Sequence, residues 1–569
     1  MEDRRTAIAI LLCMFLFMFW FEWVMAPYKN RPPAVSSASP TPAPADTSKL
    51  PPPPPAVATG KAPPAPAAPA QSASSLLPSS NDILQAPSIR VTTSKVELTL
   101  SSLGARLTSY KLKDYPAELG KTELLDLVAV RNGAPYPLGV YVAEHSDVAV
   151  TYELSASPQP SAEGEIALSA GQEALLSFKG TLPNGSVIRK EIRFSGDSYL
   201  FSVDAIVDAS LGQPWIEWSH HDAALNGNVR INHNYVTLLS NNKVNLKELT
   251  ALTKEDVLLS PQQWIAFGDK YFAAALVAPS AAQPSGIIKL DNTYLTRMQG
   301  FSSAKGLLVY AGPKEQAALI RAGHQLERSV DLGWFAFVAH PLLDLLRLFN
   351  KWFGNYGLAI VLLTLVIKTA FLPLTRTSFR SMRAMQALQP EMKALRERIQ
   401  DQNQLNKETM ALYKKHGVNP MGGCLPMLIQ FPVFLGLYNA LNYSIELRHA
   451  EFALWVNDLS SPERLELFGM GVPVMILLMG LTMLIQQITT PSAADPQQKK
   501  IMLLLPLILV VSFIIFPFPS GLVLYMFVNN LISIVQQVQM KSDSARNAWA
   551  MTLAGSAVIF SACYAITLL

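Results

Sequence analysis

Cysteine and charge are both scarce in this chain of 569 residues. Its three cysteines, Cys13, Cys424 and Cys563, all lie in apolar runs, so neither a disulfide framework nor a metal-ligand spacing can be built from them. Charged residues make up only 15% of the chain, and a net charge of +4 is too small to indicate nucleic-acid binding. No motif of a serine hydrolase, a zinc protease or a phosphate-binding loop is present. The sequence therefore predicts no enzyme, no cofactor and no metal site.

Long apolar runs, by contrast, are abundant at both ends of the chain. A run of about 20 apolar residues is long enough to cross a bilayer core of roughly 30 Å. Residues 1–26 follow this pattern after Arg4 and Arg5, and the bulky stretch "FEWVMAPYK" argues against cleavage, so we expect an uncleaved anchor. Further spans are predicted at about 355–374, 421–442, 471–490, 500–517, 520–540 and 548–569. Four of these lie within 421–540 and are joined by short loops, so the chain is predicted to be a polytopic helical membrane protein.

Basic residues indicate how the spans are oriented. The loop 375–420 contains nine lysines and arginines against four acidic residues. The positive-inside rule places this loop in the cytoplasm, together with the N-terminus. Seven spans then leave the C-terminus and the region between residues 27 and 330 on the outer side of the membrane.

The region outside the membrane divides into a linker and a β-domain. Residues 27–87 hold 17 of the 41 prolines amid alanine and serine, a composition typical of a disordered spacer. Residues 88–330 instead show short stretches such as "KVELTLSS" and "VIRKEIRF", in which apolar residues alternate with polar ones. This period of two, interrupted by Gly, Pro and Asn, predicts antiparallel strands and a large β-sandwich.

Residues 333–352 are predicted to form an amphipathic helix. Leu342, Leu345, Leu346 and Phe349 recur at helical spacing. A helix lying in the outer interface, with Trp334 and Trp352 as anchors, fits this pattern. The alternative is a helix packed on the β-domain.

One lysine interrupts the apolar run "LAIVLLTLVIKTAFLPL" at 358–374. Lys368 either extends its stem toward the headgroups or faces a water-filled cavity within the bundle. Thr364 lies one turn away on the same helical face, which favours the cavity. Gln430, Tyr525, Asn529 and Ser533 place further polar groups on other spans, although each alone is typical of a helix–helix hydrogen bond. No acidic residue lies in these spans to pair with Lys368, so we expect a hydrated groove.

The basic loop 375–420 is predicted to fold as a helical hairpin interrupted at "DQN". Apolar residues at helical spacing form one face of each arm. The opposite face is basic and carries Arg380, Arg383, Lys393, Arg396 and Arg398. Such a face suits acidic lipids, ribosomal RNA or an acidic partner; a merely solvated face is the alternative.

Several stretches of the sequence resemble the YidC/Oxa/Alb family of membrane protein insertases. They are "NPMGGCLPMLIQFPVFLGLYNAL" at 419–441, "FALWVNDLS" at 452–460, "DPQQKKIMLLLPL" at 495–507 and "FPSGLVLYMFVNNL" at 518–531. The resemblance is strong over 333–540 and architectural elsewhere, and it indicates a Gram-negative form with a large periplasmic domain.

This resemblance implies a fold and a mechanism. Five core helices form a groove that is closed to the outside and open to the cytoplasm and to lipid, with one basic residue inside, here Lys368. Gln430, Tyr525 and Asn529 are expected to line it with Thr364. A substrate helix would slide along the third and fifth spans, over Leu428, Phe431, Pro432, Leu435, Leu504, Leu505 and Ile508. The resemblance also implies a supersandwich fold for the periplasmic domain.

The implied function is insertion and folding of nascent inner-membrane proteins, alone or with the Sec translocon. The ribosome, the signal-recognition-particle receptor and the phospholipid bilayer are further expected partners. The sequence departs from the family pattern at Lys368, where arginine is common, and at the additional span 548–569. A lysine can lose its proton when desolvated, whereas an arginine cannot.

Two other functions compete with this interpretation. A secondary transporter for a small anion would use Lys368 as its binding site, but no inverted repeat of Gly- or Pro-broken helices is evident. Anion flux in proteoliposomes without insertion of a single-span substrate would support it. A membrane-tethered carbohydrate-binding module would instead depend on the β-domain, and deletion of most of residues 90–320 would then abolish function.

Overall fold

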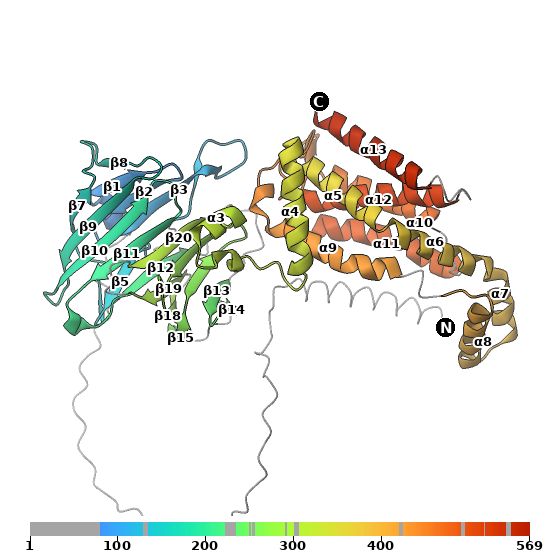
Figure 1. The fold of residues 1–569 in the computed structure, drawn as a ribbon, viewed down its shortest axis with the longest axis horizontal. Coiled ribbons are helices and arrows are strands. Elements are labelled where there is room, and N and C mark those ends of the chain that lie inside the picture. Colours follow the sequence, from blue (N-terminus) through green and yellow to red (C-terminus); the bar gives the residue numbers. More distant parts are fainter. Residues whose placement is uncertain are drawn as a thin grey trace, which may run out of the picture. The chain divides into compact units, whose positions relative to one another are not determined.

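The computed structural model describes residues 80–128, 135–221, 235–249, 252, 256–290, 293–300, 306–419, 425–490, 496–516, 518–541 and 548–568. The anchor predicted at 1–26 and the predicted linker as far as residue 79 lie outside the described residues. The described chain has a strand-rich region and then a helical region (Figure 1). This order agrees with the predicted fold class in its two parts, a β-domain followed by a helical region.

The strand-rich region contains three sheets. The first has the order β4-β3-β2-β1-β8, the second β14-β13-β16-β17-β20-β11-β10-β9-β7, and the third β15-β18-β19-β12-β5-β6. The strands are β1 (Ser88–Thr92), β2 (Val96–Ser101), β3 (Leu107–Pro116), β4 (Leu124–Asp126), β5 (Gly139–Val142), β6 (His145–Ser146), β7 (Glu153–Ser157), β8 (Glu165–Ala167), β9 (Glu173–Thr181), β10 (Val187–Ser195), β11 (Leu200–Ile206), β12 (Trp215–His221), β13 (Tyr235–Ser240), β14 (Lys243–Glu248), β15 (Asp256–Gln262), β16 (Trp264–Gly268), β17 (Phe272–Val277), β18 (Gln283–Leu290), β19 (Thr293–Gln299) and β20 (Leu307–Pro313). Short helices accompany them: α2 (Ser80–Gln85), η2 (Ala209–Leu211), α3 (Gln316–Ala322) and η3 (Leu326–Ser329).

Alternation of side chains explains why these segments form strands. Along β10, Ile188, Ile192 and Phe194 are buried while Arg189 and Arg193 are exposed. Because successive side chains in a strand point to opposite faces, this pattern places one face of the sheet on the core. Among the described residues, paired strands are antiparallel except β1 with β8, and β16 and β17 of the second sheet pack against β19 of the third. The predicted antiparallel sandwich is thereby confirmed.

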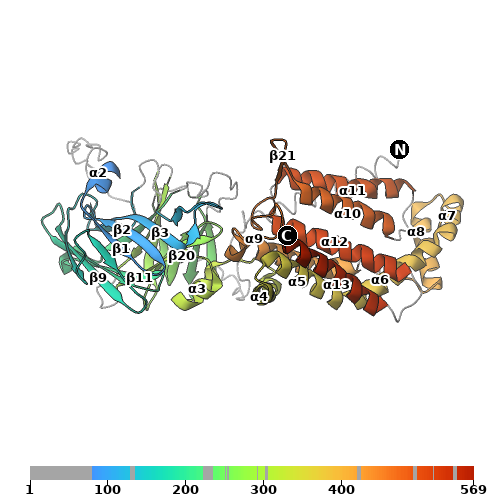
Figure 2. The ribbon, with the colours of Figure 1, turned by 90° about the horizontal axis from the view of Figure 1, so that it is seen from above.

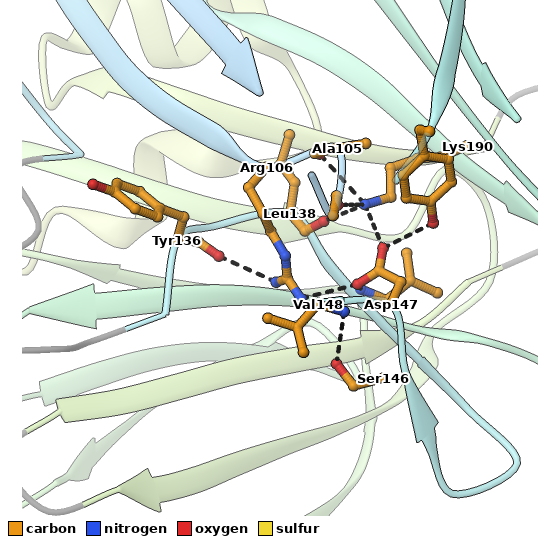
Figure 3. A network of polar contacts seen from close by, with 11 residues as sticks. Ala105, Arg106, Tyr136, Leu138, Ser146, Asp147, Val148 and Lys190 are labelled. Atoms are coloured by element: carbon orange, nitrogen blue, oxygen red, sulfur yellow. Dashed lines mark hydrogen bonds and ion pairs between the residues drawn. The ribbon is translucent and has the colours of Figure 1, made fainter. Parts of the chain in front are cut away.

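A charged cluster lies inside the β-domain, between the start of β3, the end of β6 and β10 (Figure 3). Asp147 is fully buried and accepts a hydrogen bond from Arg106 Nη2 at 2.9 Å. Its other oxygen lies 2.7 Å from Lys190 Nζ and accepts from the Tyr152 hydroxyl at 3.1 Å. Lys190 also donates to the carbonyls of Gly104 and Leu138, each at 2.8 Å. Buried charges are tolerated where they are paired and hydrogen-bonded in this way, so the cluster holds three distant segments together.

Asp204, a second acid of the same domain, has a less favourable electrostatic environment. Asp204 on β11 lies directly opposite Glu191 on β10, and its Oδ1 is buried without a hydrogen-bond partner in the described structure. Burial, and then the charge of Glu191, raise the pKa of Asp204 to about 6. When the pKa of an acid is higher in the folded protein than in the unfolded chain, the protein loses stability as the pH rises from the lower of these two pKa values to the higher.

We expect Asp204→Asn to stabilise the protein at pH 7.5 and to have little effect at pH 4.5. The gain is about 1 kcal/mol after allowance for partial solvent screening of this half-buried group. Thermal melting followed by the strand signal in circular dichroism at both pH values measures it. Exposed Glu163 provides the matched control, since Glu163→Gln should leave both melting temperatures unchanged. An equal gain for Asp204→Asn at both pH values would contradict this account.

The helical region contains helices of 10 to 22 residues. They are α4 (Ala336–Phe353), α5 (Tyr356–Ala370), α6 (Leu372–Ala387), α7 (Gln389–Arg398), α8 (Gln402–Lys415), α9 (Leu425–Tyr443), α10 (Val474–Thr489), α11 (Pro496–Ile515), α12 (Ser520–Lys541) and α13 (Ala548–Thr567). A short helix, η5 (Ile445–Leu447), and a hairpin of β21 (Leu465–Leu467) and β22 (Met470–Val472) lie between α9 and α10.

One described helical stretch, Ser520–Met540, has the length and composition to cross a membrane by itself. The pair α5 and α6 also qualifies if counted as one span, but it bends by 59° at Phe371. Val474–Thr489, Met502–Ile515 and Thr552–Thr567 are shorter apolar helices. The seven predicted spans and their orientation therefore stay predictions. The predicted span at 355–374 ends earlier in the structure, because Pro373 begins a new helix.

Helix α4 is amphipathic, as predicted, and its leucine face is buried within the helical region. Leu342, Leu346 and Phe349 are buried, and α4 packs mainly against α5 and α9. The helix runs across the ends of α5 and α9 rather than alongside them (Figures 1 and 2). Trp334 and Trp352 are 64% and 63% exposed, and their role as interfacial anchors stays a prediction.

Candidate functional site: the polar interior of the helical bundle

The bundle is an open series of helices. Its packing runs from α9 to α4, α5, α12, α10 and α11 in turn, and α13 packs outside on α12 and α5. Helix α11 packs mainly on α10, and α9 packs mainly on α4. Figure 2 shows α10 and α11 side by side and α13 next to α12. The two ends of the series, α9 and α11, therefore keep faces that no other described helix covers extensively.

Lys368 is the cation of this interior. It lies on the last turn of α5, is half-buried, and its Nζ donates a hydrogen bond of 2.8 Å to Ser533 Oγ on α12. Ser533 in turn donates to the Asn529 carbonyl at 2.8 Å. Within the described residues no carboxylate forms an ion pair with Lys368. An ammonium has three donors, so the hydrogen bond to Ser533 leaves capacity for water or for an anionic group.

Gln430 and Asn529 extend the polar surface from α12 to α9. Gln430 Nε2 donates to Asn529 Oδ1 at 3.1 Å. Tyr525, one turn before Asn529, is buried with its ring 6.5 Å from that of Phe434. The structure thus brings Lys368, Gln430 and Asn529 together from α5, α9 and α12.

Thr364 contributes less than the sequence suggested. It is 1% exposed, and its hydroxyl donates to the Ile360 carbonyl of its own helix at 2.7 Å. A threonine bonded in this way satisfies its hydroxyl within the helix and presents mostly its methyl group to its surroundings. The expected polar stripe on α5 is therefore carried by Lys368.

A second polar stripe, between α10 and α12, was not anticipated. Thr489 donates to Gln537 Oε1 at 2.6 Å, and Gln537 Nε2 donates to Thr490 Oγ1 at 2.9 Å. Two turns away, Asn530 Nδ2 donates to Thr482 Oγ1 at 3.5 Å. Asn530 and Gln537 are seven residues apart, and this helical spacing is the feature of the sequence from which the stripe could have been predicted. These hydrogen bonds join α10 to α12, so this stripe stabilises the packing of the two helices. Asn529 of α12 bonds instead to Gln430 of α9.

The predicted slide residues differ in exposure: some are exposed, some are half-buried and one is buried. Leu504 and Leu505 on α11 are 53% and 40% exposed, whereas Ile508 is half-buried. On α9, Phe431 and Pro432 are half-buried, and the Phe431 ring meets Phe335 edge to face. Nothing is described for the side chain of Leu428.

Leu435 is a correction to the predicted slide. It is 3% exposed, so it belongs to the packed interior and is absent from the accessible surface of α9. The next residue, Gly436, lies against Val338 of α4. Helix α4 therefore covers this part of α9, which the sequence pattern of a uniformly apolar helix did not reveal.

The basic loop folds as α6, α7 and α8, and α7 packs against α8 as a hairpin. The first predicted arm is divided in two, because Pro390 lies in the first turn of α7. Arg380, Lys393, Arg396 and Arg398 are exposed, and Arg383 is half-buried over the Phe379 ring. Most of the predicted basic face is thus accessible.

Together the β-domain and the lysine-containing bundle define a helical membrane protein with a large extramembrane domain. The family described as "60Kd inner membrane protein" matches residues 348–547, and the family described as "YidC periplasmic domain" matches residues 88–345. The chain belongs to the YidC family of membrane protein insertases, a family of inner-membrane proteins.

Individual relatives agree with this assignment. The membrane protein insertase YidC of Pelobacter propionicus is 34% identical, over 94% of this chain and 98% of its own length. That of Syntrophobacter fumaroxidans is 38% identical, over 76% of this chain and 82% of its own length. A crystal structure of an active YidC insertase matches with 17% identity and a TM-score of 0.35, covering 79% of this chain and 91% of that one.

Proposed function

We propose that this chain inserts and folds nascent inner-membrane proteins, alone or with the Sec translocon, through the polar interior of its bundle. The observation that carries the proposal is the set Lys368, Gln430, Asn529 and Ser533, which hydrogen bonds join across the apolar helices α5, α9 and α12. No covalent bond is formed or broken in this action.

The physical effect is a lower cost of moving a polar tail across lipid. A charged side chain at the centre of a bilayer costs about 3 kcal/mol by insertion scales. Side-chain amides, a hydroxyl and a cation replace part of the lost hydration of a tail that enters partway. An acidic tail gains further from Lys368 at a distance of a few Å and from the outside-positive membrane potential.

The apolar part of the substrate takes a different path. Leu504 and Leu505 on α11, with Phe431 and Pro432 on α9, form the slide along which a substrate helix would pass into lipid. Since these residues stand at the two open ends of the helix series, a substrate helix reaches lipid between them without separating any packed pair.

Orientation and recruitment complete the proposal. The basic hairpin of α7 and α8 lies in the cytoplasm with the N-terminus, and the β-domain lies in the periplasm. The exposed Arg380, Lys393, Arg396 and Arg398 receive the ribosome, the signal-recognition-particle receptor or acidic lipids. The balance of basic residues in the sequence supports this topology.

Cysteine crosslinking to a stalled nascent membrane protein tests the proposal. In a background in which Cys13, Cys424 and Cys563 are replaced by serine, we expect Phe431→Cys and Leu504→Cys to crosslink to the substrate helix. Leu481→Cys is the control, because Leu481 is equally apolar and 54% exposed but lies on α10, away from the ends of the series. Equal crosslinking at all three positions would show only proximity in lipid and would overturn the proposed path.

A further inference from the structure

Helix α13 lies on the pair formed by α5 and α12, next to the cation. Thr552 Oγ1 donates a hydrogen bond of 2.8 Å to Gln539 Oε1 on α12. Near the other end of α13, the rings of Phe560 and Tyr564 lie 5.1 and 6.4 Å from that of Phe353, at the end of α4. The helix is thus held at both ends against the bundle.

The contact between α13 and α12 is close. A Cβ added at Gly555 would lie 2.7 Å from Val535 Cγ1, a distance that real Cβ atoms do not adopt. Thr552 and Ser556, on the same face as Gly555, are 2% and 6% exposed. Small residues on one helix face allow two backbones to approach in this way. The opposite face carries Leu553 and Val558, which are 51% and 69% exposed.

The pair covered by α13 is also the pair that holds the cation. Lys368 belongs to α5 and its partner Ser533 to α12, so α13 packs on the two helices that this hydrogen bond joins. Leu504 on α11 has no such cover and is 53% exposed. The bundle is therefore asymmetric: α11 offers accessible leucines and α9 the exposed Ile429, whereas the α5–α12 pair lies behind a further helix.

We propose that α13 is a fixed wall that closes the α5–α12 seam, so that a substrate helix leaves the bundle only between α9 and α11. This inference rests on the proposed function and assigns a role to the additional C-terminal helix. Without α13, lipid and a substrate helix reach the outer surface of the α5–α12 pair. The substrate helix can then leave the bundle on this side as well as between α9 and α11.

The test places a cysteine at Val535, under the wall, and another at Leu504, on the slide, in the full-length protein without native cysteines. With α13 in place we expect the stalled substrate helix to crosslink to position 504 and not to position 535. Removal of residues 548–569 should expose position 535 to the substrate. Gly555→Leu, which pushes α13 away without deleting it, should likewise produce crosslinking at position 535 where the intact protein shows none.

Ala554→Leu is the matched control. Ala554 neighbours Gly555 but is exposed, so the same added volume meets no helix and crosslinking at position 535 should stay absent. Crosslinking at 535 with α13 intact, or none after either disruption while 504 still crosslinks, would overturn the wall. Loss of crosslinking at 504 in the intact protein would instead overturn the proposed function.

Discussion

Asp147→Ala is expected to destabilise the β-domain by about 3–5 kcal/mol, the range seen when one partner of a buried ion pair is removed. Asp147 is fully buried, and its two oxygens accept hydrogen bonds from Arg106, Tyr152 and the Val140 amide and pair with Lys190 (Figure 3). Alanine leaves two buried cations facing each other without their shared anion. Neither can reach solvent, since the side chains of Arg106 and Lys190 are 3% and 0% exposed.

Pulse proteolysis of the full-length protein in increasing urea measures this loss through the survival of residues 88–313. Asp114→Ala is the control, because Asp114 pairs with Lys95 at 2.9 Å on the surface and should change stability by less than about 1 kcal/mol. A triple variant, Arg106→Met, Asp147→Ala and Lys190→Met, should recover much of the loss. If it is no more stable than Asp147→Ala, the cost comes from lost packing and not from unpaired charge.

Lys368→Glu is expected to reduce insertion of substrates with acidic tails by roughly tenfold, while neutral tails are much less affected. The reason is a reversal of the charge that faces the tail at a distance of a few Å. Lys368→Arg should be nearly silent, since it retains the charge and can still donate to Ser533. Protease protection of single-span substrates in vesicles, with tails that differ only in acidic residues, measures the effect.

Lys351→Glu is the matched control for this substitution. Lys351 is exposed on α4, so reversing its charge alters the net charge of the protein equally without placing an acid in the interior. Insertion of both substrate classes should stay near wild type. Equal impairment by Lys368→Glu and Lys368→Arg would show that the position needs the lysine shape and would remove the basis for a charge-dependent role.

The family and the fold class could be predicted because they depend on local pattern. The alternation seen in "VIRKEIRF" predicts β10, whose apolar positions are indeed buried. The apolar runs predict the helices α5, α9 and α12 within a few residues of their ends. The stretches "GGCLPMLIQFP" and "FPSGLVLY" suffice for the family, which the sequence relatives confirm.

Partners within the bundle could not be predicted in the same way. A helical period tells which residues share a face, but not which helix that face meets. For this reason the pairs of Lys368 with Ser533 and Gln537 with Thr490 appear only in the structure. The amphipathic pattern of α4 did not say what its leucine face meets; in the structure this face packs against α5 and α9, and Leu435 of α9 is buried.

The sequence by itself determined the kind of protein this is, because apolar length, strand alternation and the basic loop act through neighbouring residues. Only the tertiary structure decided where polar groups meet and which surfaces stay open. Arg106, Asp147 and Lys190 are 41 and 43 residues apart along the chain, and Lys368 and Ser533 are 165 apart. Such contacts depend on how whole elements pack. Packing covers some apolar faces and leaves others open; α13, for example, covers part of α12. The pattern of neighbouring residues does not show which faces are covered.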